Sequence, residues 1–175
     1  MRTEVVYRTP WCELVAKTMN PGEAPWYSVR TPDYTAVVAL TETGRLVAVR
    51  QYRPAVERWT VELPAGILDP GETPEHCARR ELLEETGLSA PEWRSLGSFI
   101  VDANRGCGTC NGFLALRAVK TAEPDPGDLQ QQIIHLVDPP TLRELWRTGG
   151  LGELASVAVV GLGLAAIEKA GWHPG

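Results

Sequence analysis

The chain has 175 residues, of which 43% are hydrophobic and 22% are charged, enough for one domain that buries a sizeable core without disulfides or a structural metal. Its 17 lysines and arginines against 22 aspartates and glutamates give a net charge of −5, which argues against a protein that binds a DNA or RNA backbone. Four cysteines are too few for a secreted disulfide scaffold, the N-terminus has no apolar run of signal-peptide length, and the longest apolar stretch, Leu154 to Ile167, is too short to span a bilayer. These features predict a soluble, cytoplasmic protein with no nucleic-acid or membrane partner.

Runs rich in β-forming residues, separated by glycines and prolines, predict a mixed α+β pattern in one domain, residues 1–175. Residues 1–33 are expected to supply an N-terminal sheet, from 4–19 and 26–29, ahead of a main body, residues 34–175. Strands of the body are predicted, in chain order, at 34–40, 46–50, 59–63, 93–101, 112–119 and 132–137. Helices of the body are predicted at 73–87, 140–146 and 151–170.

The helix between Thr73 and Gly87 has clear ends. Thr73 is a hydroxyl N-cap followed by a proline at the first helical position, and Gly87 is typical of the residue just past a helix C-terminus. Leu82 and Leu83 point away from the acidic side of this helix, and we expect both of them to face the core.

Three glutamates gather on one face of that helix. Glu81, Glu84 and Glu85 are spaced i, i+3, i+4, which places their carboxylates within an arc of about 100°. A solvated acidic face is the ordinary explanation, but like charges at this spacing cost about 0.2–0.5 kcal/mol per pair, and Arg80 is the one basic residue four positions from any of them. The helix macrodipole also disfavours acids near the C-terminus. A bound divalent cation removes this conflict, and oxygen ligands without His or Cys suit Mg²⁺ or Mn²⁺.

The segment from Gly66 to Leu88 also carries a longer pattern. It contains Gly66, Glu72 and then the run Arg80-Glu81-Leu82-Leu83-Glu84-Glu85-Thr86-Gly87-Leu88. This arrangement resembles the complete Nudix box, G-x5-E-x7-R-E-U-x-E-E-x-G-U, in which U is aliphatic. The resemblance implies a Nudix hydrolase: an α/β/α sandwich with a mixed sheet and a loop-helix-loop motif, which hydrolyses a nucleoside diphosphate linked to another group with the help of Mg²⁺ or Mn²⁺. Residues 34–175 would then be the catalytic core.

The resemblance also implies roles for the box residues. Glu81 and Glu85 would be the principal metal ligands, and Glu84 would add a ligand or act through water. Arg80 would orient the glutamates and Glu72 would support the loop through a charge-assisted bond. The remaining expected metal ligand is the carbonyl oxygen of Ala65.

The residues before the box bear on the substrate. The runs R-Q-Y-R at 50–53 and E-x-P-A-G at 62–66 resemble the branch of the family that hydrolyses ADP-ribose and other nucleotide sugars. The resemblance implies that Arg53 contacts a phosphate and that Glu62 lies near the loop that opens the box, residues 66–73 (the box loop). Arg50 is a further candidate for substrate binding. Two exposed strand arginines are the simpler explanation of Arg50 and Arg53.

In this branch the N-terminal strands often complete a homodimer and carry an aromatic residue that stacks on the base. Trp26 is our candidate for that aromatic residue, although a core position is the commoner fate of a tryptophan. Products of the expected reaction would be a nucleoside monophosphate and a sugar phosphate.

Two departures from that branch keep other substrates open. The segment 102–110 contains no proline where many members carry a Ser-Pro-Gly-like run, and its Arg105 could contact the substrate or simply lie in a polar connection. The loop 123–132 has glutamines where some members place a glutamate that activates water, so the general base is unassigned, with Glu123, Asp125, Asp128 or a box glutamate as candidates. Nucleoside triphosphates, dinucleoside polyphosphates or a coenzyme are the alternative substrates, and a non-catalytic nucleotide sensor is a third hypothesis.

Cys107 and Cys110 form a lone C-x-x-C pair. A zinc site would need two further ligands, and the three histidines are not spaced to provide them. We therefore expect these two cysteines to be incidental thiols.

Overall fold

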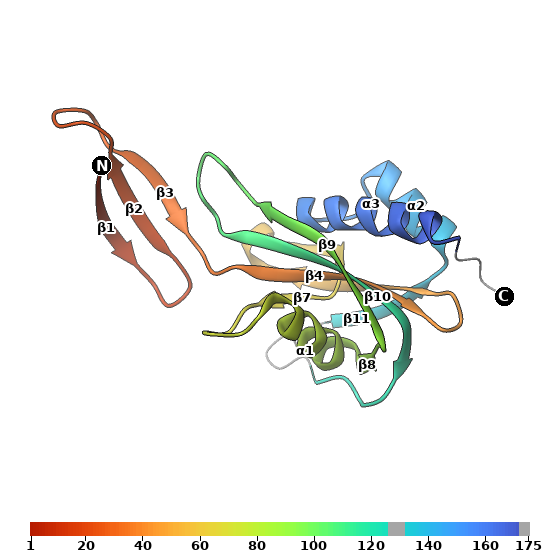
Figure 1. Ribbon diagram of the computed structural model, residues 1–175. Helices are drawn as coiled ribbons and strands as arrows, with labels where there is room; N and C mark the ends of the chain where they lie inside the picture. The colour runs from red at the N-terminus through yellow and green to blue at the C-terminus, as the bar shows by residue number, and fades with distance from the viewer. Residues whose placement is uncertain (126–131, 172–175) are drawn as a thin grey trace.

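The computed structural model describes residues 1–125 and 132–171 (Figure 1). A small sheet is formed by β1 (Arg2–Arg8), β2 (Glu13–Thr18) and β3 (Trp26–Arg30). A larger eight-stranded sheet is formed by β4 (Tyr34–Thr41), β5 (Leu46–Arg53), β6 (Arg58–Glu62), β7 (Ala65–Ile67), β8 (Leu88–Ser89), β9 (Glu92–Ile100), β10 (Thr109–Lys120) and β11 (Gln132–Val137). The helices are α1 (Pro74–Thr86), α2 (Pro139–Thr148) and α3 (Leu154–Lys169), with a short 3₁₀ turn at Pro54–Val56.

The larger sheet is mixed. Its main path runs β11-β5-β4-β10-β8, with β6 beside β5, β7 beside β4 and β9 beside β10. The pair β4 and β10 is parallel, and all the other pairs are antiparallel. Helix α1 lies on one face of this sheet, and α2 and α3 lie on the other (Figure 1). The expected α+β class and α/β/α sandwich are confirmed.

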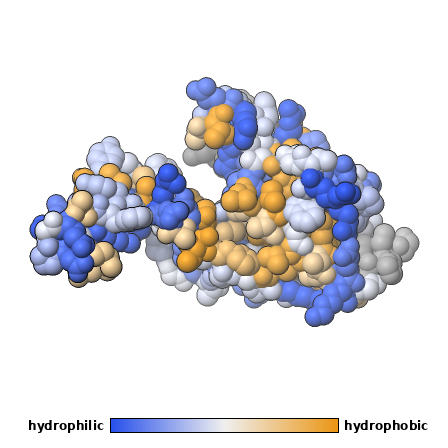
Figure 2. All heavy atoms as spheres, turned by 90° about the horizontal axis from the view of Figure 1, so that it is seen from above, coloured by the Kyte–Doolittle hydropathy of each residue, from blue (hydrophilic) through white to orange (hydrophobic). Residues whose placement is uncertain are grey.

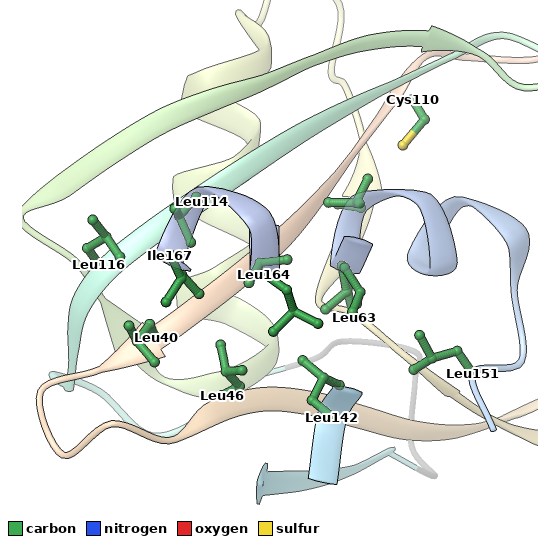
Figure 3. Packing of buried hydrophobic residues seen from close by; sticks show 14 residues of the cluster. Leu40, Leu46, Leu63, Cys110, Leu114, Leu116, Leu142, Leu151, Leu164 and Ile167 are labelled. Atoms are coloured by element: carbon green, nitrogen blue, oxygen red, sulfur yellow. The ribbon is translucent and has the colours of Figure 1, made fainter. Parts of the chain in front are cut away.

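Two apolar clusters hold these layers together, because the side chains of β4 alternate between the two faces. Val38 and Leu40 pack under α2 and α3, in the cluster drawn in Figure 3. Val37 and Ala39 pack toward α1 on the opposite face. The strand is therefore buried on both sides, which explains why its middle, Ala36 to Leu40, is a continuous apolar run rather than an alternating one.

The small N-terminal sheet stands apart from the body at one end of the molecule (Figure 1). The sequence predicted a sheet here, and its strands are antiparallel, with a bulge between Val5 and Tyr7 in β1. All seven residues of β1 are exposed. Val15 in β2 is fully buried, but most other side chains of the three strands are partly or fully exposed. This sheet therefore has very little core of its own.

Several boundaries differ from the sequence prediction. Strand β10 begins at Thr109 rather than 112, since Cys110 and Asn111 pair with the start of β4, and α3 begins at Leu154 rather than 151. The short strands β7 and β8 were not predicted.

The expectation for Leu83 is wrong: Leu82 is fully buried, but Leu83 is 37% exposed. A helix that packs one stripe on a sheet turns its next residue about 100° away from that stripe.

No helix among the described residues is long and apolar enough to cross a membrane.

Candidate active site

The backbone at the start of the box loop lies very close to a side chain of α1. Gly66 in β7 passes the side chain of Glu81, and a Cβ atom at Gly66 would lie 1.9 Å from that carboxylate. The helix itself begins at Thr73, whose hydroxyl accepts a hydrogen bond from the backbone N–H of His76, and it ends at Gly87 with φ +71°. Glycine at position 66 is therefore required by space, whereas glycine at 87 suits a left-handed backbone.

Arg80 is the centre of the charged network on α1. Its guanidinium donates two hydrogen bonds to Glu72, at 3.0 and 2.9 Å, and one each to Glu81 at 2.6 Å and Glu84 at 3.1 Å. A further bond reaches the carbonyl oxygen of Ile67 at 3.1 Å, on the box loop. The bonds from Arg80 lower the pKa of Glu72 to about 2. One arginine thus ties the loop to two of the three clustered glutamates.

Glu85 lies deeper than the other two glutamates. It is 3% exposed, and its carboxylate accepts a hydrogen bond from the backbone N–H of Ala65 at 3.0 Å. Burial raises the pKa of Glu85 to about 8, and burial also raises the pKa of Glu81. These carboxylates lie where a negative charge is costly unless a cation accompanies it.

The three glutamates open into one cavity of about 580 Å³. Its wall combines the acidic side of α1 with the box loop, Arg53 from β5 and Asp125 from the segment after β10. The lining residues are Arg53, Ala65, Gly66, Ile67, Asp69, Arg80, Glu81, Glu84, Glu85 and Asp125.

The donor chemistry of this cavity fits a hard divalent cation. Carboxylate oxygens of Glu81, Glu84 and Glu85 line it together with the backbone of Ala65. Among the residues that the structure describes, no three His, Cys, Asp or Glu side chains are already gathered around a single point. Arg80 bonds one oxygen of Glu81 (Oε1) and one of Glu84 (Oε2), so each carboxylate has a second oxygen with which it could bind an ion while the arginine stays in place.

Arg53 and Glu62 form a second charged unit at the edge of the cavity. Arg53 donates two hydrogen bonds to Glu62, which is 2% exposed, and Thr60 and Gln51 donate to the same carboxylate. Burial alone would raise the pKa of Glu62, but these donors together bring it below its ordinary value. The bonds to Glu62 in turn raise the pKa of Arg53. The arginine is therefore a fixed cation whose side chain remains 41% exposed.

Gln51 and Thr60 were not recognised as parts of the site from the sequence. The signal was present in the alternation of the strands: Gln51 and Arg53 are two residues apart in β5, as Thr60 and Glu62 are in β6. Each pair therefore lies on one face of the sheet, and Gln51 is directly opposite Thr60.

Besides Glu62, three residues that we considered for substrate binding lie outside the cavity lining in a single chain. The Arg50 guanidinium lies 4.7 Å from the ring centre of Trp59. Trp26, 62% exposed, donates its indole N–H to the carbonyl oxygen of Asn104 at 3.2 Å. The last of the three, Arg105, pairs with Asp102 within its own loop.

The candidates for an acidic residue outside the box that activates water differ in where they lie. Asp125 lines the cavity, and its backbone N–H donates to the carbonyl oxygen of Glu84 at 2.7 Å. Glu123 instead pairs with Lys120 and is 85% exposed. Asp128 lies outside the described residues.

Residues 30–147, well over half of the chain, match the family model described as the NUDIX domain. The chain belongs to the Nudix family. The family assignment made from the box is therefore confirmed, and proteins of this family generally need a divalent metal ion.

Individual relatives of this Nudix protein match over shorter segments. An ADP-ribose pyrophosphatase of Bacillus subtilis is 45% identical over 71 residues, which are 41% of this chain and 38% of that protein. A methanol dehydrogenase activator of Bacillus methanolicus is 46% identical over 71 residues, with the same two shares. The matched segments thus span well under half of these relatives.

Among solved structures, one described as "Crystal structure of ADP compounds hydrolase" aligns with 98% of this chain and 94% of its own, with a TM-score of 0.80. The two sequences are 20% identical, so this likeness concerns the fold.

Proposed function

We propose that this Nudix protein is a metal-dependent hydrolase that cleaves the pyrophosphate bond of ADP-ribose or another nucleotide sugar. The products are a nucleoside monophosphate and a sugar phosphate. The observation that carries the proposal is the shared cavity: the fixed cation of Arg53 faces the same space as the glutamates of α1. An anionic pyrophosphate needs positive charge on one side and a metal ion on the other, and this cavity combines an arginine with carboxylates that could hold the ion. Relatives named ADP-ribose pyrophosphatase support the choice of substrate.

The cation is Mg²⁺ or Mn²⁺, held by Glu81 and Glu85, with Glu84 and the carbonyl oxygen of Ala65 as further donors. When bound, the ion neutralises phosphate charge and lowers the pKa of an attacking water. Arg80 keeps Glu81 and Glu84 in place between turnovers, and Glu72 anchors Arg80 to the loop. Asp125 is the acid outside the box that we assign to water activation, because it lines the cavity while Glu123 points elsewhere.

The substrate proposal is tested with a panel of nucleotide sugars, nucleoside triphosphates, dinucleoside polyphosphates and coenzymes, each with Mg²⁺ or Mn²⁺. Products are separated by chromatography. We expect AMP and ribose 5-phosphate from ADP-ribose at a higher kcat/KM than any turnover of triphosphates. Faster turnover of triphosphates would move the substrate to the alternative class. Binding of ADP-ribose without hydrolysis of any compound would instead support a nucleotide sensor.

We further propose that the protein is a cytoplasmic homodimer, with residues 1–33 as its dimer-forming part and residues 34–175 as its catalytic core. The four cysteines are free thiols, as expected in a reducing compartment. Exposed apolar side chains occur on both parts: Trp26 and Tyr27 on the N-terminal sheet, and Leu154 and Leu162 on α3. Figure 2 shows apolar side chains gathered on the body, with the N-terminal sheet projecting to one side.

In a dimer with a two-fold axis, a surface of one copy can pack against the same surface of the other copy. A second copy could therefore cover both apolar surfaces. Trp26 and Arg105 would then reach a site only within the dimer. Light scattering on the full chain should give twice the monomer mass of 19.1 kDa, and a monomer at micromolar concentration would contradict this proposal.

A further inference from the structure

The start of α3 lies against the segment that leads into the box loop. Leu63, between β6 and β7, belongs to the same apolar cluster as Leu151, just before α3 (Figure 3). Residues beyond 147 lie outside the segment matched by the family model. The Nudix box itself, residues 66–88, therefore implies nothing about what the first turn of α3 does for the site.

A chain of hydrogen bonds joins α3 to this segment. Glu153 is the N-cap residue of α3, and its carboxylate accepts from the backbone N–H of Ser156 at 3.2 Å and from the Ser156 hydroxyl at 3.0 Å. The Ser156 oxygen accepts from the backbone N–H of Leu63 at 3.1 Å. Because a hydroxyl that donates to a carboxylate is a stronger acceptor, the two bonds reinforce each other.

Leu63 depends on this bond. It lies after the last residue of β6, Glu62, and before the first of β7, Ala65, so its N–H group has no place in the sheet ladders. Leu63 is 1% exposed and Ser156 is fully buried, so water does not replace the hydroxyl easily.

Two further contacts hold the same junction. The backbone N–H of Gly152 donates to the carbonyl oxygen of Val61 at 2.8 Å, and a Cβ atom at Gly152 would lie 2.4 Å from the Cβ atom of Thr60. The Tyr34 hydroxyl donates to the other oxygen of Glu153 at 3.4 Å. The carboxylate is thus fixed from two sides.

The anchored segment carries groups from both halves of the site. Glu62, directly before Leu63, holds Arg53. Ala65, two residues after Leu63, donates its N–H to Glu85. A shift of the Leu63 backbone therefore moves the arginine and the box loop together.

We propose that Ser156 and Glu153 are positioning residues, which fix the backbone at Leu63 and thereby set the distance between the Arg53 side and the metal side of the cavity. This inference rests on the proposed function for its catalytic consequence, whereas its effect on metal affinity can be measured without substrate. Neither residue touches the substrate or the ion in this scheme.

The test compares Ser156→Ala with Asp138→Ala in the full chain. Asp138 is a matched control, because it caps α2 by accepting from the backbone N–H of Thr141 at 2.7 Å and lies outside the cavity lining. Calorimetric titration with Mn²⁺, without substrate, is the readout that a merely structural role would not move. We expect Ser156→Ala to weaken Mn²⁺ binding about tenfold, at the lower end of what outer-shell substitutions cost, and kcat/KM to fall with it.

Asp138→Ala should lower the melting temperature but leave both quantities unchanged. Should Ser156→Ala fail to fold, Glu153→Gln decides, since it removes the charge from a half-buried residue and keeps an acceptor oxygen; its Mn²⁺ affinity should also fall. Wild-type affinity and kcat/KM in the variants would overturn the inference. If the wild type binds Mn²⁺ but hydrolyses no ADP-ribose, the proposed function is wrong, but the Mn²⁺ affinities of the variants still test the positioning role of Ser156 and Glu153. Wild-type protein that binds no Mn²⁺ would overturn both.

Discussion

Helices α1 and α3 cover opposite faces of one sheet, yet they are built in contrasting ways. Helix α1 carries six charged side chains in 13 residues, and one of its buried residues is a glutamate. Helix α3 has no charged residue before Glu168, and it buries Val159, Val160 and Leu164 against the sheet. Repulsion among the like charges of a functional site destabilises the helix that carries them. Apolar packing elsewhere in the protein offsets this loss of stability. We therefore expect α1 to supply the chemistry and the apolar body of α3 to supply the stability.

Glu85→Gln should give the largest effect on activity. The change keeps the size of the side chain but removes a charge that we assign to the metal, so hydrolysis should fall at least about 10²-fold. Thermal stability should not fall, because burial makes the charged form of Glu85 costly. Steady-state kinetics and a melting curve check the two halves of this prediction.

Glu75→Gln is the matched control for Glu85→Gln. Glu75 lies on the same helix, but it is exposed and pairs with Arg79. Equal activities of the two variants would refute the metal role of Glu85.

Leu164→Ala tests the other helix. Leu164 is 4% exposed within the cluster under α3, and truncation of such a leucine costs about 2–5 kcal/mol of unfolding free energy. Activity per folded molecule should stay close to wild type, because Leu164 lines no part of the cavity. Urea denaturation gives the loss directly. Leu83→Ala, at the exposed leucine of α1, should cost less than about 1 kcal/mol. Similar losses at both leucines would contradict the division of labour between the helices.

Asp125→Asn should have a smaller effect on activity than Glu85→Gln. We expect kcat to fall about tenfold with little change in KM, which is less than the roughly 10²–10⁴-fold that a proton-transfer group typically contributes, because a box glutamate can also act as the base. Glu123→Gln, two residues earlier, should leave kcat unchanged because Glu123 is exposed and paired with Lys120. Steady-state kinetics at saturating Mg²⁺ separate the two variants. A loss in Glu123→Gln without one in Asp125→Asn would reverse the assignment.

The sequence was most informative where one short element determines the geometry. The spacing of Glu81, Glu84 and Glu85 in one helix requires a common face, and the structure places all three in one cavity. The metal and catalytic roles assigned to these residues stay predictions. The fold class could also be predicted, because the box is specific to one family.

Contacts between distant segments could not be predicted. Ser156 and Leu63 are 93 residues apart, and no local pattern marks their hydrogen bond. Strand β10 was predicted to begin three residues too late because its first residues form a strand only by pairing with β4. The exposure of Leu83 likewise depends on how α1 is set on the sheet. Each of these features depends on tertiary packing rather than on local preference.

Glu72→Gln should give the smallest effect, visible as a change in the pH dependence of stability. The pKa of Glu72 falls from an ordinary 4.5 to about 2 through the bonds from Arg80. A group with a lowered folded-state pKa contributes stability above its unfolded pKa, and that contribution disappears as the pH falls through the folded value. The pair should therefore stabilise α1 and its loop at neutral pH and lose this effect between about pH 4.5 and 2.

Urea denaturation at several pH values tests this. The variant should be less stable than wild type at pH 7, and the two should converge as the pH approaches 2. Glu75→Gln should show little difference from wild type at any pH, because exposed ion pairs contribute little. A gap between Glu72→Gln and wild type that does not narrow with acid would mean that Glu72 acts through packing rather than charge. Helix α1 would then be held to its loop in the way that α3 is held to the sheet, and the contrast between the two helices would be confined to the cavity itself.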